Sequence, residues 1–164
     1  MEPFTVAALP GQSRYGAVVT DLSPEAIDDP AVRRALHDLW LDKGVIVFRG
    51  LEGGMDTQVR LSEIYGEPEV HPMMAGTDIR TEHKALAPIE FREESGNIYE
   101  VQGELLGGYL PWHFDGAYVD RINHGGILRP EVLPGRGGNT GFLDQIAAWE
   151  LLPASLRERI EGLN

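Results

Sequence analysis

The sequence contains no cysteine, and this absence removes several kinds of chemistry at once. Disulfide bonds, thiolate zinc sites and cysteine nucleophiles are all excluded. Histidine and carboxylate side chains remain as the candidate metal ligands, because they bind divalent metals where thiolates are missing. The lack of cysteine also suits a reducing cytoplasm, which is where we expect the protein to reside.

Positive charge is also scarce, with 14 Lys and Arg residues against 26 Asp and Glu residues and a formal net charge of −12. A surface of this sign repels phosphate backbones and anionic lipids, so we expect neither a nucleic-acid partner nor membrane binding. No apolar run approaches the roughly 20 residues that span a bilayer. Residues 1–4 lack the basic region that opens a signal peptide, which again favours a soluble cytoplasmic protein.

The length of 164 residues predicts one domain, here residues 1–164, and 42% hydrophobic residues are enough for a core. The predicted strands are residues 4–9, 15–20, 45–48, 97–102, 110–115, 127–133 and 140–143. The predicted helices are residues 30–43, residues 56–65, a helix capped by Asp144, and a last helix that carries Leu156 and Ile160. Residues 71–95 show no sustained period and are predicted as mostly loop, with a strand at 84–91 as an alternative. This pattern favours a mainly β fold with flanking helices, of the α+β class, around an antiparallel sheet.

The stretch P-W-H-F-D at residues 111–115 carries the clearest chemical signal. Side chains alternate along an extended segment, so His113 and Asp115 are expected on one side, with Trp112 and Phe114 on the other as core residues. An imidazole and a carboxylate, joined by a histidine from a distant strand, form the facial triad that holds Fe(II). Zinc stays open as an alternative metal on affinity alone.

Further motifs follow at fixed spacing: L-P-G-R-G-G-N-T at residues 133–140 and A-A-W-E-L-L at residues 147–152. Earlier in the chain stand Y-G-A at residues 15–17, G-V-I-V-F-R-G at 44–50 and Y-G-E-P at 65–68. In order and spacing these motifs resemble the TauD/TfdA family of Fe(II)/2-oxoglutarate-dependent dioxygenases. The resemblance implies a double-stranded β-helix, the clavaminate synthase-like jelly roll, which this chain would leave incomplete as the N-terminal half to two-thirds of the domain.

The resemblance also implies an activity, with Fe(II), 2-oxoglutarate and O2 as cofactor and co-substrates. The enzyme would hydroxylate a small organic substrate and release succinate and CO2. His113 and Asp115 would be two of the iron ligands, and the Thr140 hydroxyl would contact a carboxylate of 2-oxoglutarate. The second histidine ligand and an arginine for the far carboxylate are expected beyond residue 164.

Two more residues stand where relatives of this kind contact substrate. His71 occupies the position of a substrate-contacting histidine in taurine-type members, with an ordinary loop histidine as the equal alternative. Tyr109 stands where some sulfonate-using members carry asparagine, which disfavours taurine itself and leaves sulfonates, aryloxyalkanoates and carrier-bound amino acids open. The competing hypothesis is a non-catalytic truncated fragment or binding module of the same fold that lacks the third metal ligand. Its uncovered strand edges would then make a homo-oligomer one expected outcome.

Overall fold

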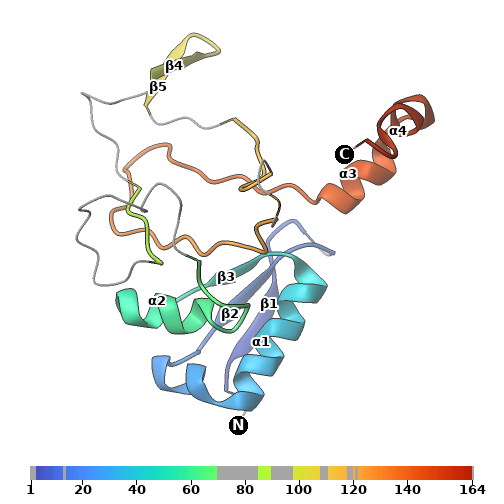
Figure 1. Cartoon of the computed structure of the whole chain (residues 1–164). Coiled ribbons are helices and arrows are strands. Elements are labelled where there is room, and N and C mark those ends of the chain that lie inside the picture. Colours follow the sequence, from blue (N-terminus) through green and yellow to red (C-terminus); the bar gives the residue numbers. More distant parts are fainter. Residues whose placement is uncertain are drawn as a thin grey trace. The chain divides into compact units, whose positions relative to one another are not determined.

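The structure is a computed structural model of the whole chain (Figure 1). It describes residues 3–12, 14–69, 85–89, 98–107, 111–117, 120 and 122–163. The chain divides into two compact units, Met1–Gly53 with Arg129–Asn164, and Gly54–Leu128. That residues 1–164 form a single domain therefore stays a prediction.

The first unit begins with a three-stranded sheet of β1 (Thr5–Ala8), β2 (Ala17–Thr20) and β3 (Ile46–Phe48), in that order. Strands β1 and β2 pair antiparallel, whereas β2 and β3 pair parallel. The expectation of a purely antiparallel sheet is therefore wrong for β3. A helical crossover joins β2 to β3, and such a connection brings the second strand back in the same direction as the first.

Helix α1 (Pro30–Lys43) forms this crossover, and the 3-10 helix η1 (Pro24–Asp28) precedes it. The carboxylate of Asp29 accepts a hydrogen bond of 2.7 Å from the Ala31 N–H, which satisfies a free donor at the helix start. Gly44 ends the helix at a φ of 71°, a left-handed conformation that favours glycine. These are the two boundaries that the sequence predicted.

The core of this unit lies where α1 and η1 pack on one another beside the sheet (Figure 1). Val32 and Leu36 of α1, Ile27 of η1 and Val19 of β2 are all at most 2% exposed. Val32 and Leu36 are four residues apart and therefore share one face of the helix. The apolar spacing of residues 30–43 thus predicted Val32 and Leu36 correctly, whereas Ala35, which the same spacing placed on this face, is exposed.

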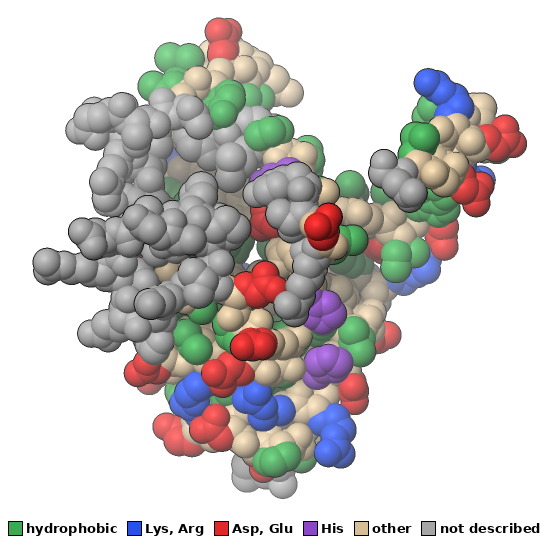
Figure 2. All heavy atoms as spheres, viewed as in Figure 1, with side chains coloured by type: hydrophobic (Ala, Val, Ile, Leu, Met, Phe, Trp, Pro, Cys, Tyr) green, Lys and Arg blue, Asp and Glu red, His purple; other side chains and the backbone are tan. Residues whose placement is uncertain are grey.

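The first unit also contains two short C-terminal helices, α3 (Gln145–Leu151) and α4 (Ala154–Ile160). Asp144 caps α3, as predicted, by accepting from the Ile146 and Ala147 N–H groups. Apolar side chains appear on these helices beside acidic and basic ones (Figure 2). Ile146 and Leu151 are 75% and 84% exposed, so neither helix buries an apolar face within the described structure.

The second unit holds helix α2 (Met55–Ser62) and a hairpin of β4 (Ile98–Val101) and β5 (Glu104–Gly107). Gln102 and Gly103 form the hairpin turn, with φ values of 54° and 80°. Positive φ at both central residues is what a type I′ turn requires. The sequence predicted β4 and α2 to within a few residues but missed β5.

Three predicted strands are wrong in the described structure, because residues 111–115, 127–133 and 140–143 contain no helix or strand. A strand exists only where a neighbouring strand takes up its backbone hydrogen bonds, and no such partner stands beside these segments among the described residues. The described part of the chain therefore shows small mixed sheets and helices without a closed roll. Within it, no helix combines the length and apolar character needed to cross a membrane.

Candidate metal centre

The predicted ligand pair lies in an irregular segment of the second unit. The Nε2 atom of His113 is 3.0 Å from Oδ1 of Asp115, so the two side chains converge as predicted. Both side chains are open to solvent, with exposed fractions of 51% and 73%. Gly116 follows at a φ of 71°, which turns the chain directly after the pair.

The aromatic residues between and before the two ligands do not behave as predicted. Trp112 is 69% exposed and Phe114 is 45% exposed, so the expectation that they are core residues is wrong within the described structure. The cause is the same as for the missing strand. Without a packed sheet, the segment has no opposite face that could bury them.

A second contact fixes the imidazole ring of His113. Its Nδ1 atom lies 2.8 Å from the backbone carbonyl oxygen of Pro111. A carbonyl only accepts, so this hydrogen bond requires a proton on Nδ1. In a neutral ring the lone pair is then on Nε2, which is the atom that faces Asp115.

This tautomer leaves two electron-rich atoms, Nε2 of His113 and Oδ1 of Asp115, facing each other at 3.0 Å. A positive charge between them resolves the repulsion, either as a second proton on the ring or as a metal ion. The hydrogen bond to the Pro111 carbonyl raises the pKa of His113; partial desolvation opposes this effect, and the Asp115 carboxylate adds to it. The same arrangement that favours the proton favours a metal cation in its place.

The two donor atoms are close enough to bind one ion. Their separation of 3.0 Å is that of an ordinary hydrogen bond, so a proton holds them together as readily as a metal ion would. A metal-bound histidine usually donates its other N–H to a carbonyl or carboxylate, as His113 does to Pro111. The donor set, an imidazole nitrogen and a carboxylate oxygen, therefore fits Fe(II), and it fits zinc as well.

The Pro111 carbonyl is the functional group that the sequence reasoning missed. A proline two residues before the candidate histidine was the available signal, because the fixed φ of proline restricts where its neighbours can turn. Among the described residues, no group of three or more His, Cys, Asp or Glu side chains could hold a metal. His71 and Tyr109 lie outside the described residues, and their substrate roles stay predictions.

Thr140 belongs to the first unit, whereas the ligand pair belongs to the second. Its contact with 2-oxoglutarate therefore stays a prediction. Thr140 is exposed and follows Gly137 and Gly138, which have φ values of 75° and 67°. A Cβ atom at Gly138 would lie only 2.6 Å from Cγ of Pro134, so both conformation and space require glycine there.

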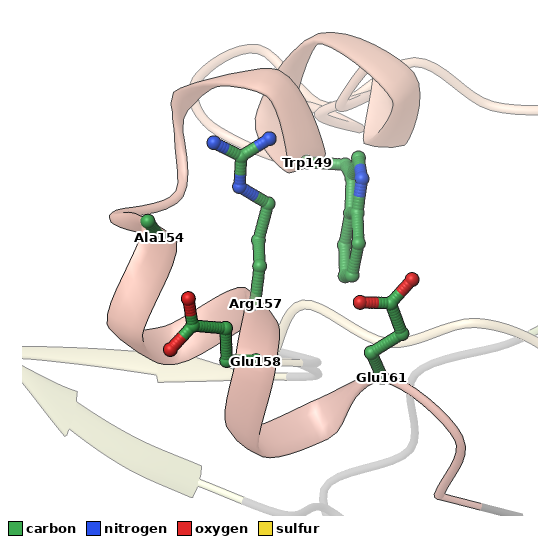
Figure 3. Close-up of a pocket in the computed structure, with 5 residues that line it drawn as sticks. All are labelled: Trp149, Ala154, Arg157, Glu158 and Glu161. Carbon is green, nitrogen blue, oxygen red and sulfur yellow. The ribbon is translucent and has the colours of Figure 1, made fainter.

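A hollow of about 270 Å³ opens between α3 and α4, and no predicted site residue lines it. It is lined by Trp149, Ala154, Arg157, Glu158 and Glu161. Figure 3 shows the stem of Arg157 running beside the Trp149 ring, with the Glu161 carboxylate near the edge of the indole. This lining contains no histidine and offers no counterpart to the His113–Asp115 pair.

The features described so far are a solvent-open pair of one histidine and one carboxylate, with the histidine ring held by a backbone carbonyl. Residues 5–164 match the profile of the taurine catabolism dioxygenase TauD, TfdA family, and the chain belongs to this family.

Individual relatives agree with this family. An (S)-phenoxypropionate/alpha-ketoglutarate-dioxygenase from Sphingobium herbicidovorans is 31% identical over 160 residues, covering 98% of this chain and 52% of the relative. The protein of the same name from Delftia acidovorans is 28% identical over 153 residues, covering 93% and 51%. An alkylsulfatase from Acinetobacter baylyi is 27% identical over 151 residues, covering 92% and 43%. The chain thus spans about half the length of the relatives it matches.

Proposed function

We propose that the protein carrying this chain is an Fe(II)- and 2-oxoglutarate-dependent dioxygenase that hydroxylates a small organic substrate. The observation that carries the proposal is the 3.0 Å approach of His113 Nε2 to Asp115 Oδ1, with the ring held by the Pro111 carbonyl. Membership of the TauD/TfdA family and the α-ketoglutarate dependence named for two relatives support it.

When bound, the iron supplies the activation of O2 by which substrate, 2-oxoglutarate and O2 become hydroxylated substrate, succinate and CO2. The chain's own residues hold the ion and orient the co-substrate. Nε2 of His113 and Oδ1 of Asp115 bind the ion, and the Pro111 carbonyl holds the ring so that its lone pair faces the metal. The Thr140 hydroxyl donates a hydrogen bond to a carboxylate of 2-oxoglutarate, and a third ligand comes from outside the described residues.

The proposed fold of the complete domain is the double-stranded β-helix of the family. Exposed apolar side chains among residues 128–143 support this fold. If these residues formed strands of a packed sheet, the side chains on one face of each strand would be buried. These side chains are Leu128, Val132, Leu133, Phe142 and Leu143, each at least 55% exposed. In the complete roll, residues 110–115, 127–133 and 140–143 would be strands.

The proposed substrate is a small organic anion. Phenoxypropionate and the alkyl sulfates implied by the relatives' names both combine an apolar body with an anionic group. His71 and Tyr109 are proposed to contact the substrate, since a protonated imidazole attracts an anion. Iron, co-substrate and substrate would then meet on the open face of the triad.

Turnover tests this proposal directly. The full protein, loaded with Fe(II) and 2-oxoglutarate under nitrogen and then exposed to air, is offered phenoxypropionate, an alkyl sulfate and taurine in separate reactions. We expect succinate and hydroxylated product in equal amounts with at least one anion, and none in the His113→Ala variant. Binding of iron without any succinate from a wide panel would instead favour a binding module of the same fold.

A further inference from the structure

We infer that Gln58 is a positioning residue that anchors the metal-ligand segment to helix α2. This inference rests on the proposed metal site at His113 and Asp115. The Nε2 amide group of Gln58 donates a hydrogen bond of 3.1 Å to the backbone carbonyl of Ile127. The two residues are 69 positions apart, and the bond is partly buried.

The hydrogen bond of Gln58 attaches to the stretch of chain that follows the two metal ligands. Residues 111–117 carry both ligands and residues 122–128 follow them in the same unit, and neither stretch contains a helix or strand. An irregular segment without ladder hydrogen bonds is held by its side-chain contacts. The Gln58 amide ties the end of this segment, twelve residues after Asp115, to a regular helix.

Helix α2 is a suitable support for such an anchor. Leu61 of this helix is 4% exposed, and Ile64, just after it, is 9% exposed, so the helix has a buried face. The hydroxyl of Ser62 donates a 2.8 Å hydrogen bond to the Gln58 carbonyl. This bond stays within the helix and touches no part of the ligand segment, which makes Ser62 a matched control.

The consequence for the site is preorganisation. A metal ion binds most tightly when its ligands are already held near their bound positions, since less ordering then accompanies binding. Loss of a direct partner of a ligand typically lowers metal affinity about 10-fold to 100-fold. Gln58 acts through the eleven residues between Asp115 and Ile127, so we expect a smaller loss of about threefold to tenfold.

The test is Mn(II) affinity, measured by the electron paramagnetic resonance signal of unbound Mn(II) with the full protein in its metal-free form. Mn(II) replaces Fe(II) because it is stable in air. The removal variant is Gln58→Met, which keeps the length of the side chain and deletes the donor. Gln58→Lys, which keeps a donor of similar reach, should restore most of the affinity. The melting temperature of each metal-free variant is measured alongside.

We expect Gln58→Met to bind Mn(II) about threefold to tenfold more weakly, with Ser62→Ala close to the wild type. Equal affinity of Gln58→Met and wild type would overturn the inference, as would an equal loss in Ser62→Ala. A lower melting temperature with unchanged affinity would mean a purely structural role. If Gln58→Met does not fold, Gln58→Asn, whose amide is one methylene too short to reach, takes its place. Absence of Mn(II) binding by the wild type would count against the proposed function instead.

Discussion

The N-terminal sheet and helix differ sharply from the segment that carries the motifs. In residues 14–50, the strands pair with neighbours close in sequence, and Ala17, Val19 and Leu36 are at most 1% exposed. In the described part of residues 111–143, no helix or strand forms, and Val132 is 86% exposed. The part of the chain that stabilises its own fold is therefore separate from the part that carries the predicted chemistry.

This difference has a physical cause. The N-terminal strands find their partners across the eight residues 9–16 or across one helical crossover, so closing these loops costs little conformational entropy. The motif segments have the sequence pattern of strands, but they need neighbouring strands that the described residues do not supply. Substitutions in the first region should therefore change stability, and substitutions in the second should change binding and turnover.

The largest expected effect is the loss of either metal ligand. His113→Ala and Asp115→Ala each remove a primary ligand, so we expect no detectable 2-oxoglutarate-dependent succinate formation by the full protein. Thermal unfolding of the metal-free variants should match that of the wild type, because both side chains are exposed. Succinate formation by mass spectrometry and circular dichroism melting measure the two effects.

His124→Ala is the matched control for these variants. This histidine is also exposed and lies in the same unit, nine residues after Asp115. We expect it to retain wild-type turnover. Wild-type turnover in Asp115→Ala would show that this carboxylate is not an iron ligand, and the proposed facial triad would then be wrong.

The next largest effect lies in the stable region and should leave metal binding intact. Leu36→Ala empties a fully buried position on α1, whereas Leu41→Ala removes a side chain that is 64% exposed on the same helix. Core substitutions of this kind cost about 2 to 5 kcal/mol of unfolding free energy. Exposed ones usually stay within about 0.5 kcal/mol. Urea unfolding of both variants measures the difference, and equal destabilisation would contradict the assigned helix face.

The sequence predicted local features of the chain better than features that depend on pairing between distant segments. Capping by Asp29 and Asp144 and the Gly44 stop are local signals, so the helix boundaries at these residues were predicted correctly. The parallel direction of β3 and the strand β5 depend on pairing, which a single strand pattern does not encode. The approach of His113 to Asp115 needed only two-residue spacing and was predicted. The Pro111 contact depends on the turn of an irregular backbone and was not.

A smaller effect is expected at the proposed co-substrate contact. Thr140→Val deletes a hydroxyl donor and keeps the branched shape, so KM for 2-oxoglutarate should rise while the iron stays bound. A hydrogen bond to a charged group contributes about 1.5 to 3 kcal/mol, or roughly 10-fold to 150-fold in affinity. Thr140→Ser keeps the donor and is the control. An unchanged KM in Thr140→Val would show that Thr140 is an ordinary surface residue without a contact to 2-oxoglutarate.

The smallest effect concerns Tyr65, the half-buried tyrosine that follows α2. Burial raises the pKa of Tyr65 from 10.0 to about 12. The unfolded chain therefore loses this proton near pH 10, while the folded protein keeps it to about pH 12. Between these values the folded state binds more protons than the unfolded state, so the free energy of unfolding falls as pH rises.

Tyr65→Phe removes this titration. Its stability should decline less than that of the wild type between pH 10 and 12, with both proteins differing little in slope below pH 10. Urea unfolding at half-unit pH steps measures the two slopes. If Tyr65→Phe keeps the wild-type slope, Tyr65 is open to solvent in solution.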